Sequence, residues 1–129
     1  MFWRRRPKTN KELGRIGEDH AARFLASRGY KIRHRNFRLG RGAEVDIVAE
    51  HNGALVFVEV KSRTADDGFA PRDKVNRGKQ RQVARAADAY LRTRERRDRV
   101  MRFDIVEVYL TPQGQVQKIE VFEGAFRAR

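Results

Sequence analysis

Residues 44–61 read EVDIVAEHNGALVFVEVK, two apolar-rich runs joined by Asn52-Gly53. Asn-Gly between alternating apolar residues is the strongest short signal for a β-hairpin, because both residues tolerate the positive φ angles of a type I′ turn. We therefore expect strands at Ala43–Glu50 and Leu55–Arg63. The Leu-Val-Phe-Val-Glu-Val run in the second strand indicates burial on both of its faces.

The turn also predicts the register of the hairpin. A two-residue loop pairs His51 with Ala54, and a four-residue loop gives the same register, whereas a three-residue loop would shift it by one. In the first two cases Asp46 lies directly opposite Glu59. Because side chains alternate along a strand, both carboxylates project from the same face of the sheet.

Two carboxylates that oppose each other repel, and their apolar neighbours make that repulsion costly. Lys61, two residues past Glu59 and opposite Glu44, is one source of compensation. A raised pKa that leaves one acid neutral is a second, and a bridging divalent cation is a third. All-oxygen ligands favour Mg²⁺ or Mn²⁺ over Zn²⁺. The competing interpretation is an ordinary solvated sheet face, with Lys61 as a simple partner of Glu44.

The rest of the chain predicts an α/β fold of one domain, residues 1–129, in the order α-β-β-β-α-β-β. Thr9 and Glu12 have the spacing of a capping box, for a helix that ends near Arg28 before Gly29. Residues 1–8 are expected to be a flexible basic N-terminus. Further elements are expected at 30–38 (strand), 73–94 (helix), 101–110 (strand) and 116–122 (strand), with a loop at 64–72 and a basic connection at 92–102.

Charge indicates a polyanionic partner. The chain has 30 Lys+Arg against 17 Asp+Glu, a formal net charge of +13. A surplus of this size on a small domain usually indicates nucleic acid. The chain has no cysteine, which excludes a disulfide scaffold and thiolate metal sites. No apolar run is long enough to span a bilayer, and none follows the basic start as in a signal peptide, so we expect a cytoplasmic protein without membrane contact.

The second helix carries basic side chains in two groups. Lys74, Arg77, Arg81 and Arg85 fall on one stripe that points away from the apolar side, which predicts either a phosphate track or a solvated face. Lys79 and Gln82 fall on the margin of the apolar side, from where they could approach the active centre. The residues expected to contact nucleic acid are Lys74, Arg77, Lys79, Arg81, Gln82 and Arg85.

Together these residues resemble the PD-(D/E)xK nuclease superfamily, with Val45-Asp46 followed one strand later by Glu59-Val60-Lys61. Val45 stands where the superfamily's name has proline. More specifically, the chain is similar to the bacterial YraN-like family of predicted endonucleases, which is related to archaeal Holliday junction resolvases. The segments that carry this resemblance are 17–18, 29–32, 35–38, 44–48, 56–63 and 102–106.

The resemblance implies a restriction-endonuclease-like, three-layer α-β-α core with a mixed sheet. It implies that Asp46 and Glu59 hold a Mg²⁺ or Mn²⁺ ion with the Val60 carbonyl. Lys61 would orient the attacking water or stabilise charge on the phosphate, and Glu18 would join the site from the first helix. Because resolvases of this fold act as dimers, it also allows a homodimer.

Three functions are consistent with the sequence. The first is a metal-dependent endonuclease that hydrolyses phosphodiester bonds in DNA, including branched or damaged DNA. The second is a non-catalytic nucleic-acid-binding module that retains the nuclease fold. The third is a basic partner of an acidic protein or of ribosomal RNA. The complete set of Asp46, Glu59 and Lys61 favours the first.

Overall fold

A computed structural model describes residues 6–64, 77–94 and 100–127 of the chain. Its elements are α1 (Asn10–Ser27), β1 (Lys31–Arg38), β2 (Glu44–His51), β3 (Ala54–Thr64), α2 (Arg77–Arg94), β4 (Val100–Leu110) and β5 (Val116–Phe122). The predicted order α-β-β-β-α-β-β is confirmed. The expected loop after residue 64, the expected helix start at Asp73, residue Lys74 and most of the basic connection before β4 lie outside the described residues.

The first helix begins and ends as the sequence predicts. The Thr9 hydroxyl accepts a hydrogen bond from the Glu12 amide (3.1 Å), and the Glu12 carboxylate accepts one from the Thr9 amide (2.9 Å). This reciprocal capping box satisfies two amides that the helix itself cannot. The helix ends at Ser27, and Gly29 follows at a φ of 88°, a left-handed conformation that favours glycine.

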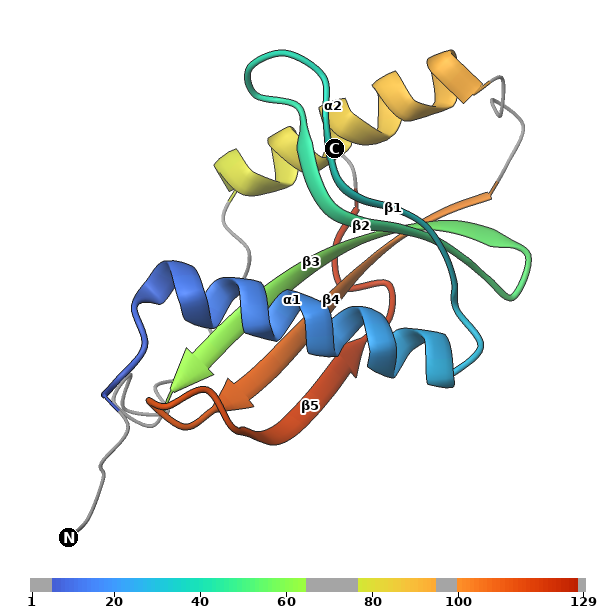
Figure 1. The fold of residues 1–129 in the computed structure, drawn as a ribbon. Helices are drawn as coiled ribbons and strands as arrows, with labels where there is room; N and C mark the ends of the chain where they lie inside the picture. The colour runs from blue at the N-terminus through green and yellow to red at the C-terminus, as the bar shows by residue number, and fades with distance from the viewer. Residues whose placement is uncertain (1–5, 65–76, 95–99, 128–129) are drawn as a thin grey trace, which may run out of the picture.

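Five strands form one mixed sheet in the order β1-β2-β3-β4-β5. The β3–β4 pair is parallel, and the other three pairs are antiparallel. Helix α1 packs on β3 and β4, and α2 packs on β2 and β3 from the other side (Figure 1). The three-layer α-β-α architecture is therefore confirmed. No helix in the described parts of the chain is long and apolar enough to cross a membrane.

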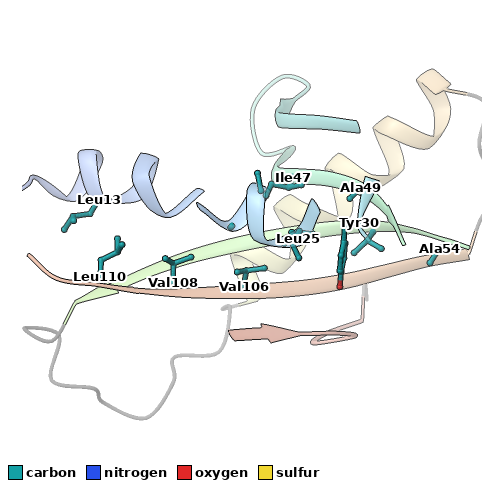
Figure 2. Close-up of a cluster of buried hydrophobic side chains, with 13 residues drawn as sticks. Leu13, Leu25, Tyr30, Ile47, Ala49, Ala54, Val106, Val108 and Leu110 are labelled. Atoms are coloured by element: carbon teal, nitrogen blue, oxygen red, sulfur yellow. The ribbon is translucent and has the colours of Figure 1, made fainter. Parts of the chain in front are cut away.

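Two hydrophobic cores lie on opposite faces of the sheet. Leu25 of α1 lies with Val106 and Val108 of β4 in the first core (Figure 2). Phe57 packs with Val83 and other α2 residues in the second. Successive β3 residues enter alternate cores, which confirms the predicted burial of this strand on both faces. Each fully buried side chain of this size contributes about 1.5–3 kcal/mol.

The β2–β3 hairpin has the predicted turn and register. Asn52 and Gly53 both have positive φ, 49° and 79°, as a type I′ turn requires. His51 pairs with Ala54, and the ladder continues without a shift to Ile47 opposite Val58.

On the side of Ile47 that is farther from the turn, β2 and β3 separate, which the sequence did not predict. The ladder does not reach Glu44 and Lys61, whose pairing was expected. At this level the Asp46 side chain accepts a hydrogen bond from the Val60 amide (2.8 Å), and Asn36, which lies opposite Asp46 on β1, has a φ of 54°. Val45 and Val48 pack in the same core, although strict alternation would separate them. Figure 1 shows β2 turning away from β3 at this point.

Candidate active site

The Asp46 carboxylate lies where β2 separates from β3. Its Oδ2 atom accepts a hydrogen bond from the Val60 amide at 2.8 Å. The side chain therefore takes the backbone donor of β3 just beyond the end of the ladder. Burial raises the pKa of Asp46 to about 6, an effect that the Val60 hydrogen bond opposes. The predicted proximity of Asp46 and Glu59 is confirmed, although a hydrogen bond to the backbone, not a ladder pair, fixes Asp46.

Glu59 is the more deeply buried carboxylate of the pair. Only 3% of its surface is exposed, and its Oε1 atom is buried without a hydrogen-bond partner among the described residues. Burial, and then the negative charge of Asp46, raise the pKa of Glu59 to about 8. A buried carboxylate oxygen without a partner is costly, and where one occurs it indicates a ligand or a functional role.

Lys79 of α2 lies beside Glu59 and Glu44. Its Nζ atom lies 3.5 Å from Oε2 of Glu59 and 3.5 Å from Oε1 of Glu44. The positive charge lowers the pKa of both Asp46 and Glu59 against the effect of burial. The structure thus places Lys79 next to Glu59 and Glu44, an approach that its position on the margin of the apolar side allowed.

Glu18 joins the site from α1, as expected. Its Oε1 atom accepts hydrogen bonds from Asn36 (2.8 Å) and Arg35 (3.2 Å), and 15% of its side chain is exposed. Its negative charge contributes to the raised pKa of Asp46, after burial. Glu18 of α1 therefore lies near enough to Asp46 for its charge to act on it, as the charge of Asp46 acts on Glu59.

The remaining predicted residues occupy two regions. Lys61 is half-buried on β3, and alternation places it on the same face as Glu59. Arg77, Arg81 and Arg85 are exposed on α2, and Gln82 is half-buried there. Of the α2 residues expected to contact nucleic acid, Lys79 is the one that the described ion pairs bring to the carboxylates, whereas Lys74 lies outside the described residues.

Two residues that the sequence analysis did not assign to the site help to build it. Asn36 donates to Glu18 from the distorted part of β1, and Arg35 also pairs with Asp19 at 2.6 Å. Asparagine is among the few residues that adopt positive φ readily, so an Asn within a predicted strand was the available signal. Glu44, for which Lys61 was the expected partner, pairs with Arg38 at 3.2 Å and with Lys79.

The residues of this site fall within a stretch that matches a known family. The model of the uncharacterised protein family UPF0102 matches residues 17–108, which include Glu18, both hairpin carboxylates and Lys79. The chain belongs to the UPF0102 family. This membership agrees with the similarity to YraN-like proteins found in the sequence.

Other UPF0102 proteins match nearly the whole chain. The UPF0102 protein of Syntrophotalea carbinolica is 47% identical over 115 residues, which cover 88% of this chain and 90% of the relative. That of Geobacter metallireducens is 43% identical over 117 residues, or 91% of this chain and 93% of the relative. That of Dictyoglomus turgidum is 38% identical over 117 residues, or 91% and 98%. The similarity therefore extends over most of this chain and of each relative.

The donor atoms of this UPF0102 site fit a hard divalent cation. Among the described residues, no three His, Cys, Asp or Glu side chains are arranged to hold a metal by themselves. Mg²⁺, however, usually takes only one or two carboxylates and completes its shell with water and phosphate oxygens. Asp46 and the unpartnered Oε1 atom of Glu59 supply that number. The ammonium of Lys79 beside them already indicates that the position favours positive charge.

Proposed function

We propose that this chain is a metal-dependent endonuclease that hydrolyses phosphodiester bonds in DNA. Asp46, Glu59 and the Val60 carbonyl would hold Mg²⁺ or Mn²⁺. One observation carries the proposal: a buried Glu59 oxygen without a partner lies beside Asp46, where two strands separate. Burial of two neighbouring acids costs stability, so a cation that neutralises them is the simplest compensation.

The chain's own groups suit phosphodiester hydrolysis. A bound divalent cation supplies Lewis acidity and lowers the pKa of bound water. The Val60 amide fixes the orientation of the Asp46 carboxylate. Lys61 would add a positive charge where negative charge develops on the phosphate. Because these groups stand on strands, their positions vary little, which favours catalysis by orientation.

DNA as the substrate is supported by charge and by resemblance. The net charge of +13 favours a polyanion over a neutral or cationic substrate. The similarity to Holliday junction resolvases favours branched DNA among the possible substrates. We therefore expect a four-way junction to be cut faster than linear duplex or single-stranded DNA.

A cleavage assay with end-labelled DNA tests this function. The three DNA forms are incubated with the protein in Mg²⁺, Mn²⁺ or EDTA, and the products are separated under denaturing conditions. We expect cleavage only with metal, and a loss of at least about a hundredfold for Asp46→Ala, Glu59→Ala or Lys61→Ala. Asp88→Ala, a change at an exposed acid of α2, is the matched control. Undiminished cleavage by Asp46→Ala or Lys61→Ala would overturn the assignment.

A non-catalytic nucleic-acid-binding module is the second candidate. It is favoured by the two ion pairs of Lys79, which partly neutralise the carboxylates without any metal. This function predicts salt-sensitive binding of DNA. It also predicts that no metal, including Mn²⁺, supports cleavage by the wild-type protein in the assay above.

A further inference from the structure

A polar groove opens between α1 and β1, beside Glu18. It has a volume of about 550 Å³ and is lined mainly by charged side chains. Its lining residues are Lys11, Arg15, Glu18, Asp19, Arg35, Asn36 and Arg38. Four cations thus face two carboxylates, which gives the groove a positive surplus.

The cations of the groove differ in how they are engaged. Arg35 is held by Glu18 and Asp19, and Arg38 by Glu44. Lys11 and Arg15 are exposed and form no ion pair with any other described residue. They lie one turn apart on α1, so their Cβ atoms are about 6 Å apart and both can reach one stretch of a nucleic-acid backbone.

The groove adjoins the proposed active site. Glu18 and Asn36 line the groove, and the hydrogen bond between them (2.8 Å) joins α1 to the distorted part of β1. The charge of Glu18 also acts on Asp46. A polyanion in the groove would therefore lie next to the carboxylates that would hold the metal.

The described residues of the basic stripe on α2 make no ion pair or hydrogen bond with the carboxylates. Arg77 and Arg81 are exposed, and the helix residue that meets the carboxylates is Lys79, outside that stripe. Phosphate contacts fix the register of a nucleic acid, and contacts that adjoin the reacting centre hold the reacting bond most directly. The groove adjoins the carboxylates through Glu18, whereas no ion pair or hydrogen bond of the described stripe residues reaches them.

We propose that the groove between α1 and β1 binds the phosphodiester backbone of the DNA strand, with Lys11 and Arg15 as its phosphate contacts. The proposal rests on the proposed function, because it treats the adjoining carboxylates as the cleavage site. Arg35, which is paired with Glu18 and Asp19, lines the groove and keeps these two partners when DNA binds. Because Glu18 and Asp19 are paired with Arg35, Lys11 and Arg15 are the charges of the groove that have no ion-pair partner within the described parts of the chain.

Fluorescence anisotropy with labelled duplex DNA tests the groove. EDTA is present throughout, so that cleavage does not enter the measurement. For Lys11→Ala with Arg15→Ala we expect a roughly tenfold loss of affinity, and a plot of log affinity against log salt that is shallower by about 1.8. Exchange of the two residues, Lys11→Arg with Arg15→Lys, keeps both charges and should restore most of the affinity.

The matched control removes one arginine and one lysine outside the groove. Arg23 of α1 and Lys31 of β1 are exposed, and neither lines the groove. Arg23→Ala with Lys31→Ala changes the net charge equally and should shift the affinity by less than about twofold. Equal losses for the two double variants, or no loss for the groove variant, would overturn the proposal.

The binding and cleavage assays separate the two proposals. If the groove variant binds normally while metal-dependent cleavage still requires Asp46, the groove assignment is wrong and the endonuclease assignment stands. If the groove variant alone loses binding while the wild-type protein cleaves no DNA, the groove is supported and the endonuclease assignment is wrong.

Discussion

The ammonium of Lys79 lies 3.5 Å from the carboxylate of Glu59. Lys79 belongs to α2, and Glu59 belongs to β3, the central strand of the sheet. The same ammonium lies 3.5 Å from Glu44 on β2. It thus occupies the neighbourhood in which a divalent cation would meet Glu59. If a metal binds there, it must compete with this lysine for the same negative charge.

Lys79→Met is therefore expected to increase the affinity for metal. Removal of the competing charge should strengthen Mn²⁺ binding by about three- to tenfold, equivalent to about 0.7–1.4 kcal/mol. Binding can be measured by the loss of the free Mn²⁺ signal in electron paramagnetic resonance. Arg81→Met, a change at an exposed residue of the same helix, is the control. Weaker Mn²⁺ binding by Lys79→Met would show that the lysine supports the metal site.

Glu59→Gln is expected to stabilise the protein at high pH. The pKa of Glu59 is raised by burial from 4.5 to about 8, so the folded state disfavours ionisation. Its contribution to stability is therefore complete below about pH 4.5 and is lost as the pH rises to about 8. In thermal unfolding with EDTA, the melting temperature of Glu59→Gln relative to that of the wild type should rise across this pH range, whereas that of Asp88→Asn should not. A gain that is the same at pH 4.5 and pH 8.5 would contradict this linkage.

Gly17→Ala is expected to destabilise the protein, and Gly14→Ala is its matched control. A Cβ atom on Gly17 would lie 1.9 Å from the Ser62 hydroxyl and 3.2 Å from the Ser62 Cβ atom, whereas one on Gly14 meets nothing within 4 Å. Overpacking of this kind costs about 1–3 kcal/mol. Gly14→Ala should instead stabilise the helix by about 0.5–1 kcal/mol. Urea unfolding measures both, and equal effects of the two substitutions would refute the expected close contact.

Asp104→Ala is expected to be among the most destabilising single changes. Asp104 is fully buried and accepts hydrogen bonds from Tyr30, Arg102 and the Gly124 amide. Its removal leaves Arg102 with the more exposed Glu123 as its ion-pair partner and takes the acceptor from the Tyr30 hydroxyl and the Gly124 amide, at a cost of about 3–5 kcal/mol. Tyr30→Phe removes one donor and should cost about 0.5–1.5 kcal/mol. Denaturant unfolding tests both, and a loss below about 1 kcal/mol for Asp104→Ala would show that the network contributes little.

The fold was predictable where the local signals were strong. Asn52-Gly53 predicted both the turn and the register, because the turn type leaves one pairing for the neighbouring residues. The capping box of Thr9 and Glu12 predicted the start of α1 in the same way. In both cases the signal and its consequence lie within a few residues of each other.

The site was predictable only in part. The proximity of Asp46 and Glu59 follows from the register, but the separation of their strands does not, and neither does the distortion at Asn36 on the neighbouring strand. That distortion is a single residue whose φ angle the surrounding pattern does not specify. The double pairing of Lys79 depends on how closely α2 packs on the sheet, a tertiary distance that helical periodicity alone does not give.

The parallel pairing of β3 and β4 has a consequence for the order of folding. Every pair in that ladder, from Ala54–Val100 onward, joins residues 46 positions apart (100 minus 54). Such long-range pairing forms slowly, whereas a hairpin with a two-residue turn closes early. Both acids of the site belong to that hairpin, and Lys79 belongs to the crossover. We therefore expect the nascent chain to bring the acids together while water still surrounds them, and to enclose Glu59 only when α2 docks.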